Sequence, residues 1–352
     1  MTNLVRVAVV GATGAVGTTM LDLLAKRAFP ASEVVPFASA RSAGRVLDNG
    51  MTVRGIADDT IGGFDVAIFS AGGSISRAWA PKFAASGAVV VDNSSAFRMD
   101  DDVPLVVAEV NPDELANARK GIVANPNCTT MAIMLPLKAL HDTFGLRSFV
   151  ATSYQAAGGA GQSGMDELAD QVPTLLARRQ QLVDDGAGAL DGISSSIHAA
   201  PLAFNVVPWL GTEAGDGYSD EEMKMVFESR KILGLPALDV APTCVRVPVM
   251  VGHSIQVRAT FEREVDVAAA RAALEAFPGV VLDNLPTPVE YAGRDEVAVG
   301  RIRPDLADPR SLNLFVVGDN LLKGAALNTV QLAELLHERG LLSRSPAGSP
   351  AV

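Results

Sequence analysis

Hydrophobic positions in the first third of the chain fall into short continuous runs, separated by glycine turns and by segments with a helical period. Such runs occupy residues 5–10, 34–38, 65–70, 88–93 and 122–124. Continuous runs rich in β-branched residues are typical of strands buried on both faces. Their alternation with helical segments predicts an α/β fold with a doubly wound, Rossmann-type parallel sheet.

A second pattern begins near residue 146. Apolar and polar positions alternate along residues 254–261, which predicts a strand with one solvated face and hence an antiparallel sheet. Asp319 and Asn320 then open a helical pattern with an apolar stripe, and we expect that C-terminal helix to return to the first domain.

The 352 residues are enough for two domains. The predicted boundaries are 1–128 plus 320–342 for a nucleotide-binding domain and 129–319 for a mixed α+β domain. Residues 343–352, rich in Ser, Pro and Ala, are predicted to form a disordered tail.

Composition narrows the function classes. Hydrophobic residues make up 48% of the chain and charged residues 20%, as in a globular protein, and the net charge of −11 argues against nucleic-acid and membrane partners. The two cysteines have no paired spacing, which fits a reducing cytoplasm and neither a disulfide framework nor a zinc site. We expect no signal peptide, no membrane span and no catalytic metal.

A glycine turn follows the first predicted strand, with the spacing G-x-x-G-x-x-G over residues 11–17. Backbone amides in such a turn can approach a pyrophosphate at a helix N-terminus. A plain tight turn is the alternative, but the place directly after a buried strand favours dinucleotide binding. The predicted cofactor contacts in this turn are Gly11, Thr13, Gly14, Ala15 and Val16.

The end of the second predicted strand indicates which dinucleotide is bound. An NAD-preferring fold usually has a carboxylate there for the ribose 2′-hydroxyl. This chain has Ser39, Arg41 and Ser42 instead, which suits a 2′-phosphate and predicts NADP. A solvated loop arginine is the alternative.

Cys128 lies where the apolar run 122–124 stops and a helical pattern begins. Asn127 can cap that helix, and unpaired N–H groups in the first turn favour a thiolate. The alternative is a small buried thiol at a strand–helix junction.

Other side chains have the chemistry that a cysteine nucleophile needs. Arg246 and His253 flank a short apolar run and can place an anion-binding group and an acid/base group at one mouth, although a structural histidine is the alternative. Glu221 and Lys224, three residues apart, share a helix face and can meet a zwitterionic or phosphorylated ligand, or form a surface ion pair. Arg98 follows a predicted strand end and can also bind an anion.

Two further interpretations concern neighbouring residues. Ser219 and Glu222 match a capping box, so Glu222 is expected to serve its helix. His141, His198 and His337 are interpreted as structural or solvated, with His337 on the exposed side of the last helix.

Taken together, these stretches resemble the aspartate-β-semialdehyde dehydrogenases over nearly the whole chain. The resemblance rests on residues 11–17, 39–42, 95–99, 125–130, 154–156, 221–224, 246–249 and 252–254. It implies that Cys128 is the nucleophile, His253 the acid/base and Gln155 the residue that orients the substrate. It also implies the binding residues: Arg246 for the α-carboxylate, Glu221 for the α-amino group, Lys224, Arg98 and Asn127 for phosphate, Arg41 and Ser42 for the 2′-phosphate, and Gly158, Gly159 and Asn320 for the nicotinamide half.

The implied reaction is the reversible, NADP-dependent reductive dephosphorylation of β-aspartyl phosphate to aspartate β-semialdehyde through a cysteine thioester. It belongs to the pathway that leads to lysine, threonine, methionine and diaminopimelate, and the family forms homodimers with residues 129–319 as the catalytic and dimerisation domain. Gly158 replaces a serine that the family often has, which leaves local hydrogen bonding open. The alternatives are an N-acetyl-γ-glutamyl-phosphate reductase, which would not need Glu221, and a non-catalytic NADP-binding protein.

Overall fold

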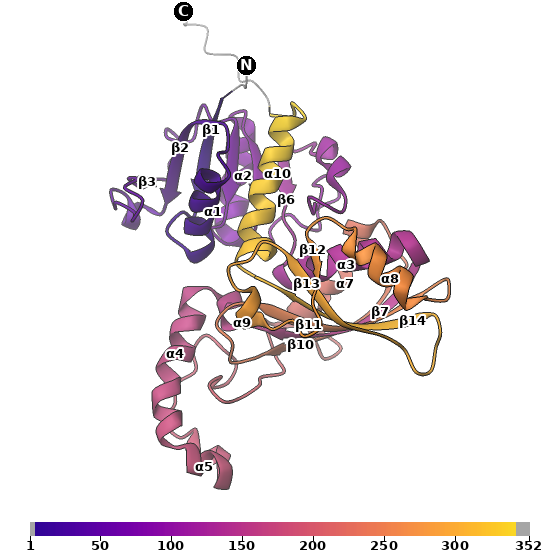
Figure 1. Ribbon diagram of the computed structural model, residues 1–352. Helices are drawn as coiled ribbons and strands as arrows, with labels where there is room; N and C mark the ends of the chain where they lie inside the picture. Colours follow the sequence, from indigo (N-terminus) through magenta and orange to yellow (C-terminus); the bar gives the residue numbers. More distant parts are fainter. Residues whose placement is uncertain (1–3, 343–352) are drawn as a thin grey trace, which may run out of the picture. The chain divides into compact units, whose positions relative to one another are not determined.

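The computed structural model describes residues 4–342, and the chain divides into two compact units (Figure 1). Unit 1 comprises Met1–Asn127, Lys231–Leu233 and Gly324–Val352, and unit 2 comprises Cys128–Arg230 and Gly234–Lys323. The predicted disordered tail, 343–352, lies outside the described residues.

Unit 1 is built on a six-stranded sheet whose order is β3-β2-β1-β4-β5-β6 and whose strands all pair in parallel. This order confirms the doubly wound sheet. The strands are β1 (Val5–Val10), β2 (Ala31–Ala38), β3 (Arg54–Gly55), β4 (Val66–Phe69), β5 (Val89–Asp92) and β6 (Ile122–Ala124).

The helices of unit 1 bury aromatic residues against this sheet. Phe83 on a helix meets Phe37 and Phe69 on strands edge-on, with ring centroids 6.0 and 5.3 Å apart. The helical segments are α1 (Ala15–Lys26), the 3₁₀ turn η1 (Ala40–Ser42), α2 (Gly73–Ala85), the 3₁₀ segment η2 (Pro112–Asn117) and α10 (Leu327–Glu338).

The C-terminal helix α10 packs within unit 1, against α1, β4 and β5, as predicted. Arg27 holds it through two hydrogen bonds to the carboxylate of Glu334, 2.8 and 2.7 Å long. The helix begins with a π-helical turn, η4 (Leu322–Ala326), rather than directly at Asp319. Oδ1 of Asp319 accepts hydrogen bonds from the backbone N–H groups of Leu321 and Leu322.

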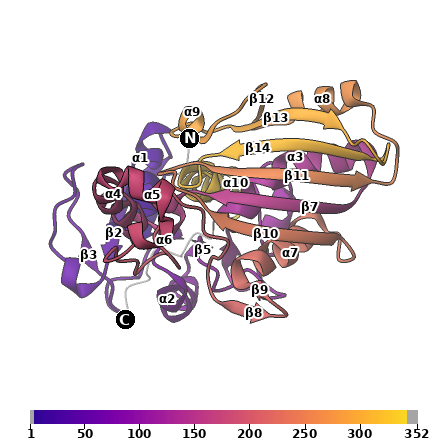
Figure 2. The ribbon, with the colours of Figure 1, turned by 90° about the horizontal axis from the view of Figure 1, so that it is seen from below.

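Unit 2 is built on a mixed six-stranded sheet with the order β10-β7-β11-β14-β13-β12 (Figure 2). The central strand β11 (His253–Phe261) is antiparallel to β7 (Leu146–Gln155) and β14 (Ser311–Gly318), as its alternating pattern predicted. The outer pairs are parallel, between β7 and β10 (Asp239–Arg246) and between β12 (Val280–Leu282) and β13 (Val297–Pro304).

One face of this sheet is covered by α3 (Cys128–Phe144) and α8 (Val267–Glu275). Alternate residues of β7 point to the other face, where Val150 is 45% exposed and Tyr154 is 37% exposed. The remaining elements of unit 2 are η3 (Ala157–Ala160), α4 (Gln162–Ala177), α5 (Arg179–Asp184), α6 (Gly186–Ala189), β8 (Glu213–Gly215), β9 (Tyr218–Ser219) and α9 (Pro288–Tyr291).

Helix α7 (Asp220–Leu233) begins in unit 2, and its last residues belong to unit 1. The predicted capping box is present at its start: Ser219 N–H donates to Glu222 at 2.9 Å, and Glu222 N–H donates to Ser219 Oγ at 3.3 Å. Among residues 4–342, no helix is long and apolar enough to cross a membrane.

Candidate active site

The glycine turn lies between β1 and α1, and two of its glycines are required by close backbone contacts. Gly11 has φ +88°, and a Cβ there would lie 2.3 Å from the carbonyl oxygen of Ser70. A Cβ on Gly17 would lie 2.1 Å from the carbonyl oxygen of Gly11. Within the described residues no side chain caps α1 at Gly14, so its first-turn amides suit a pyrophosphate oxygen.

Ser39, Arg41 and Ser42 follow β2 directly, at the carboxyl edge of the parallel sheet where ligands of this fold bind. Arg41 is exposed in the 3₁₀ turn η1, which the Ser42 N–H closes by donating to Ser39 O at 2.9 Å. This solvated guanidinium is therefore available to a phosphate.

Arg98, also in unit 1, is buried in the loop after β5. Its Nε donates to Asn125 O at 2.8 Å and its Nη2 to Asn93 O at 3.0 Å, so backbone carbonyls fix the guanidinium. Asp92 holds the start of the loop by accepting hydroxyl bonds from Ser76 and Ser94, both 2.7 Å long, and burial raises the pKa of this carboxyl.

Lys231, which the sequence did not mark as a site residue, holds the other end of this loop. Its ammonium donates to the backbone carbonyls of Arg98, Asp100 and Val103, at 2.9, 2.7 and 2.9 Å. Burial lowers the pKa of Lys231, although the nearby aspartates oppose that shift. Every residue has a backbone carbonyl, so a lysine whose three partners are carbonyl oxygens cannot be recognised from the sequence around residue 231.

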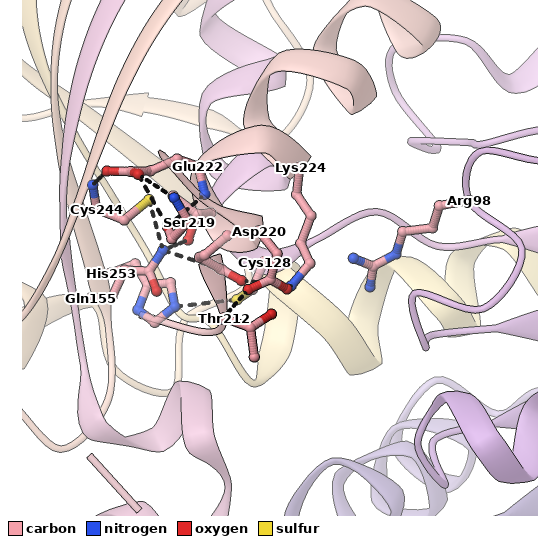
Figure 3. A network of polar contacts seen from close by, with 12 residues as sticks. Arg98, Cys128, Gln155, Thr212, Ser219, Asp220, Glu222, Lys224, Cys244 and His253 are labelled. Atoms are coloured by element: carbon pink, nitrogen blue, oxygen red, sulfur yellow. Dashed lines mark hydrogen bonds and ion pairs between the residues drawn. The ribbon is translucent and has the colours of Figure 1, made fainter. Parts of the chain in front are cut away.

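Cys128 is the first residue of α3, as predicted, and is partly exposed. Its Sγ lies 3.2 Å from Nε2 of His253, the fully buried first residue of β11 (Figure 3). Unpaired amides at the start of a helix favour negative charge on the sulfur. Asn127, which ends the first segment of unit 1, is 8% exposed.

The backbone decides which nitrogen of His253 carries the proton. Ala156 N–H donates to Nδ1 at 3.1 Å, so Nδ1 is an acceptor and the neutral ring carries its proton on Nε2, facing the sulfur. Burial, with a further contribution from Arg246, lowers the pKa of His253 to about 3. The ring is therefore a neutral hydrogen-bond donor at physiological pH.

Gln155 ends β7, and its amide Nε2 donates to Thr129 Oγ1 and, at 3.3 Å, to Glu221 Oε1. Thr129 was missed as a site residue, although it directly follows Cys128. The same Nε2 lies 3.9 Å from Sγ of the second cysteine, Cys244, which is buried in β10.

Arg246 ends β10, and its Nη1 donates to Ala156 O at 2.7 Å. Burial lowers its pKa, while the charges of Cys128 and Glu221 oppose that shift. A Cβ on Gly159 would lie 2.7 Å from Nη1 and 3.2 Å from His253 Cε1, so a glycine here preserves the space between the two side chains.

Gly158 and Asn320 lie beside this group. A Cβ on Gly158 would lie 2.8 Å from Met250 O and 3.6 Å from Nδ2 of Asn320. Asn320 Oδ1 accepts from Gly252 N–H at 2.9 Å, whereas its Nδ2 is buried and has no hydrogen-bond partner among the described residues. An orphaned donor beside a glycine fits a ligand carbonyl, such as the carboxamide of a nicotinamide.

Lys224 is held by two carboxylates of its own helix. Its Nζ lies 3.0 Å from Glu221 Oε2, as the spacing predicted, and 2.8 Å from Asp220 Oδ2, which was missed. Burial disfavours the ammonium, but these two charges outweigh it and raise the pKa of Lys224.

Within unit 2, contacts therefore connect Cys128 to His253, Gln155 to Glu221, and Glu221 to Lys224, with Gly158, Gly159 and Arg246 beside them. The glycine turn, Arg41, Arg98 and Asn127 lie in unit 1. His141 and His198 each bond a backbone group, and His337 is half-buried against Phe29 rather than on an exposed side. No cluster of three metal-binding side chains occurs in the part of the chain that the structure describes.

Comparisons with known proteins agree with this arrangement. Residues 6–118 match the family model "Semialdehyde dehydrogenase, NAD binding domain", and residues 137–323 match "Semialdehyde dehydrogenase, dimerisation domain". The aspartate-semialdehyde dehydrogenases of Streptomyces akiyoshiensis and Aquifex aeolicus are 50% and 44% identical, over 94% and 96% of this chain and 98% and 99% of theirs.

A solved structure extends the similarity to the fold. The crystal structure of aspartate semialdehyde dehydrogenase II of Vibrio cholerae, complexed with ASA, has a TM-score of 0.89 and 42% sequence identity, and the match covers 96% of this chain and 99% of that one. With both family models and these relatives matching nearly the whole chain, the protein belongs to the aspartate-semialdehyde dehydrogenase family of oxidoreductases.

Proposed function

We propose that this protein is an NADP-dependent enzyme that interconverts β-aspartyl phosphate and aspartate β-semialdehyde through a thioester on Cys128. The observation that carries the proposal is the 3.2 Å approach of Cys128 Sγ to a protonated His253 Nε2 at the start of α3. The reaction belongs to the biosynthesis of lysine, threonine, methionine and diaminopimelate, in the cytoplasm.

In this proposal, the substrate is held by its charged groups. Arg246, whose pKa is lowered but which stays charged at physiological pH, binds the α-carboxylate. Glu221 binds the α-ammonium, and Gln155 orients the acyl group with its amide fixed by Thr129. Lys224, Arg98 and Asn127 bind the phosphate.

The Cys128 thiolate attacks the acyl carbon, and the bond from carbon to the phosphate oxygen breaks, which leaves a thioester and free phosphate. A nicotinamide, when bound, supplies the hydride that reduces this thioester. His253 then donates its Nε2 proton to the resulting hemithioacetal oxygen. It recovers that proton as the carbon–sulfur bond breaks and the aldehyde leaves. A thiolate suits both steps because it is a good nucleophile and a good leaving group.

We propose that the cofactor is held by the residues whose geometry fits it. Gly11, Thr13, Gly14, Ala15 and Val16 line the pyrophosphate, and Ser39, Arg41 and Ser42 take the 2′-phosphate. Asn320 Nδ2, with Gly158 and Gly159 beside it, meets the nicotinamide half. On this assignment residues 1–128 with 320–342 form the NADP-binding domain and 129–319 the catalytic and dimerisation domain.

The proposed homodimer forms through the outer face of the unit 2 sheet. Val150 and Tyr154 are exposed there, and the Tyr154 ring lies 6.3 Å from that of Phe315 on β14. Large apolar side chains gathered on one sheet face are typical of an interface. Replacing Val150 and Tyr154 together by glutamate should yield monomers in analytical ultracentrifugation.

The activity is tested by following NADP reduction with aspartate semialdehyde, with and without phosphate. We expect reduction that requires phosphate and Cys128, and a thioester adduct in the intact mass of enzyme quenched during turnover. Equal rates with N-acetylglutamate semialdehyde would favour the related reductase instead. Arg41→Ala should raise the KM for NADP about tenfold or more and leave the KM for NAD unchanged.

A further inference from the structure

Asp220, the first residue of α7, connects Lys224 to the loop that precedes the helix (Figure 3). Its Oδ2 lies 2.8 Å from Lys224 Nζ, and its Oδ1 accepts from Thr212 N–H at 2.6 Å. Its own N–H donates to Thr212 O at 2.8 Å. The carboxylate is therefore fixed from two sides.

The backbone of the loop is shaped to admit this carboxylate. Gly211 has φ +80°, and a Cβ there would lie 1.9 Å from Asp220 Oδ1, so only glycine allows the approach. Trp209, Leu210 and Gly211 line a cavity of about 310 Å³ that Arg246 also lines. Asp220 thus bonds both the loop that lines this cavity and the ammonium of Lys224.

Two carboxylates around one ammonium leave a local charge of −1. Glu221 turns one oxygen towards Gln155 and the other towards Lys224, and it has a role of its own with the substrate amine. Asp220 instead bonds Thr212 and Lys224, so in the resting site its negative charge acts on the lysine.

We infer that Asp220 is a positioning residue that aims Lys224 at the phosphate and weakens its hold on it, so that phosphate is released after acyl transfer. This inference rests on the proposed function, in which Lys224 binds phosphate. A carboxylate in contact with the ammonium competes with an incoming anion for the same charge and repels that anion. The site therefore binds phosphate less tightly and releases it more readily.

The test is Asp220→Asn, which keeps the size of the side chain and an acceptor oxygen for Thr212 N–H but removes the charge. In the direction of aldehyde oxidation, we expect the KM for phosphate to fall about fivefold, on the scale of one partly screened charge contact. The KM for the aldehyde should stay within twofold, since Arg246 and Glu221 are untouched. In the other direction, inhibition by added phosphate should strengthen by a similar factor.

Asp220→Glu restores the charge, and its phosphate KM should return towards the wild-type value; a purely structural role would not follow charge in this way. Glu213→Gln removes an exposed carboxylate from the neighbouring β8 and serves as the control that changes net charge alone. If Asp220→Asn does not fold, as judged by its thermal melt, Asp220→Ser is read by the same criteria, because serine also removes the charge.

A substitution of Lys224 distinguishes the proposed function, in which Lys224 binds phosphate, from the inferred role of Asp220. Lys224→Gln should raise the phosphate KM by tenfold or more; an unchanged value removes Lys224 from the phosphate site and contradicts the assignment in the proposed function. If Lys224→Gln raises that KM but a folded Asp220→Asn leaves it unchanged or raises it, the role of Asp220 is wrong and the proposed function stands.

Discussion

The two cysteines of this protein occupy opposite environments in the same unit. Cys128 begins helix α3, is partly exposed, and lies 3.2 Å from an imidazole N–H. Cys244 lies inside strand β10, where burial raises the pKa of its thiol to about 12 and the charges of Glu221 and Glu222 add to the shift. Cys244 is therefore a neutral, inert thiol.

From this difference we expect burial and position at a helix start to decide the reactivity of the two thiols more than their distance from charged groups. Cys244 lies near the same Gln155 amide and the same Glu221 that border the candidate site. Cys244 is not at a helix start: it lies inside strand β10, where its own N–H donates to the Glu222 carboxylate of α7 at 3.0 Å.

The two thiols should differ most in turnover. Cys128→Ser should lower kcat by about four orders of magnitude, because a hydroxyl at this position is neither ionised nor a good leaving group. Cys244→Ser should keep kcat within about threefold, measured under the same saturating conditions. Comparable losses in both variants would contradict the division of roles.

Alkylation should make the same distinction without substrate. At pH 7.5, iodoacetamide should label Cys128 and leave Cys244 unlabelled, because a thiol with a pKa of about 12 has almost no thiolate at that pH. Peptide mass spectrometry measures both sites, and protein unfolded in guanidinium serves as the control in which both react. Labelling of Cys244 in the folded protein would contradict the assignment of this thiol as buried and neutral.

The neutral imidazole beside Cys128 should affect the pH dependence of stability. The pKa of His253 is about 3 when folded and near 6.5 when unfolded, so between these values the unfolded chain binds the extra proton. His253 therefore costs no stability above pH 6.5, and stability falls as the pH decreases below it. Between pH 6 and 4, the free energy of unfolding measured with urea should fall by up to about 1.4 kcal/mol per pH unit more in the wild type than in His253→Asn. An equal dependence of the free energy of unfolding on pH in both proteins would contradict the lowered pKa of His253 in the folded state.

Thr129 should have the smallest effect. Thr129→Val keeps the shape of the side chain and removes the acceptor of the Gln155 amide, so kcat/KM should fall about tenfold while the melting temperature changes little. Gln155→Ala sets the scale, because Thr129 acts through Gln155. A loss in Thr129→Val larger than that in Gln155→Ala would indicate a direct role for the hydroxyl.

Both sheets were predictable from the sequence because apolar residues follow a different pattern along the strands of each sheet. β1 and β4 are apolar at nearly every position, as strands covered on both faces must be, whereas β11 alternates. The parallel edges of the second sheet were not predictable, since nothing in the composition of β10 or β12 specifies the direction of its neighbour.

The candidate site residues were predictable where local chemistry marks them. Cys128 follows an apolar run and begins a helical pattern, and Glu221 and Lys224 share one helix face. Asp220, Thr129 and Lys231 were missed because their partners are set by the fold: Asp220 bonds the loop before its helix, and Lys231 bonds three backbone carbonyl oxygens. The proton position on His253 depends on a backbone amide 97 residues away.

Helix α3 has almost no solvent face: from Thr129 to Leu137 every residue is buried. Cys128, the proposed nucleophile, therefore begins a helix that tolerates few substitutions, since any change along it disturbs close-packed neighbours. In the loop at residues 209–212, by contrast, Gly211 and Thr212 are exposed, and the loop borders the cavity beside Arg246. Selection for a longer or differently charged aldehyde would therefore accumulate changes in that loop and leave α3 as it is.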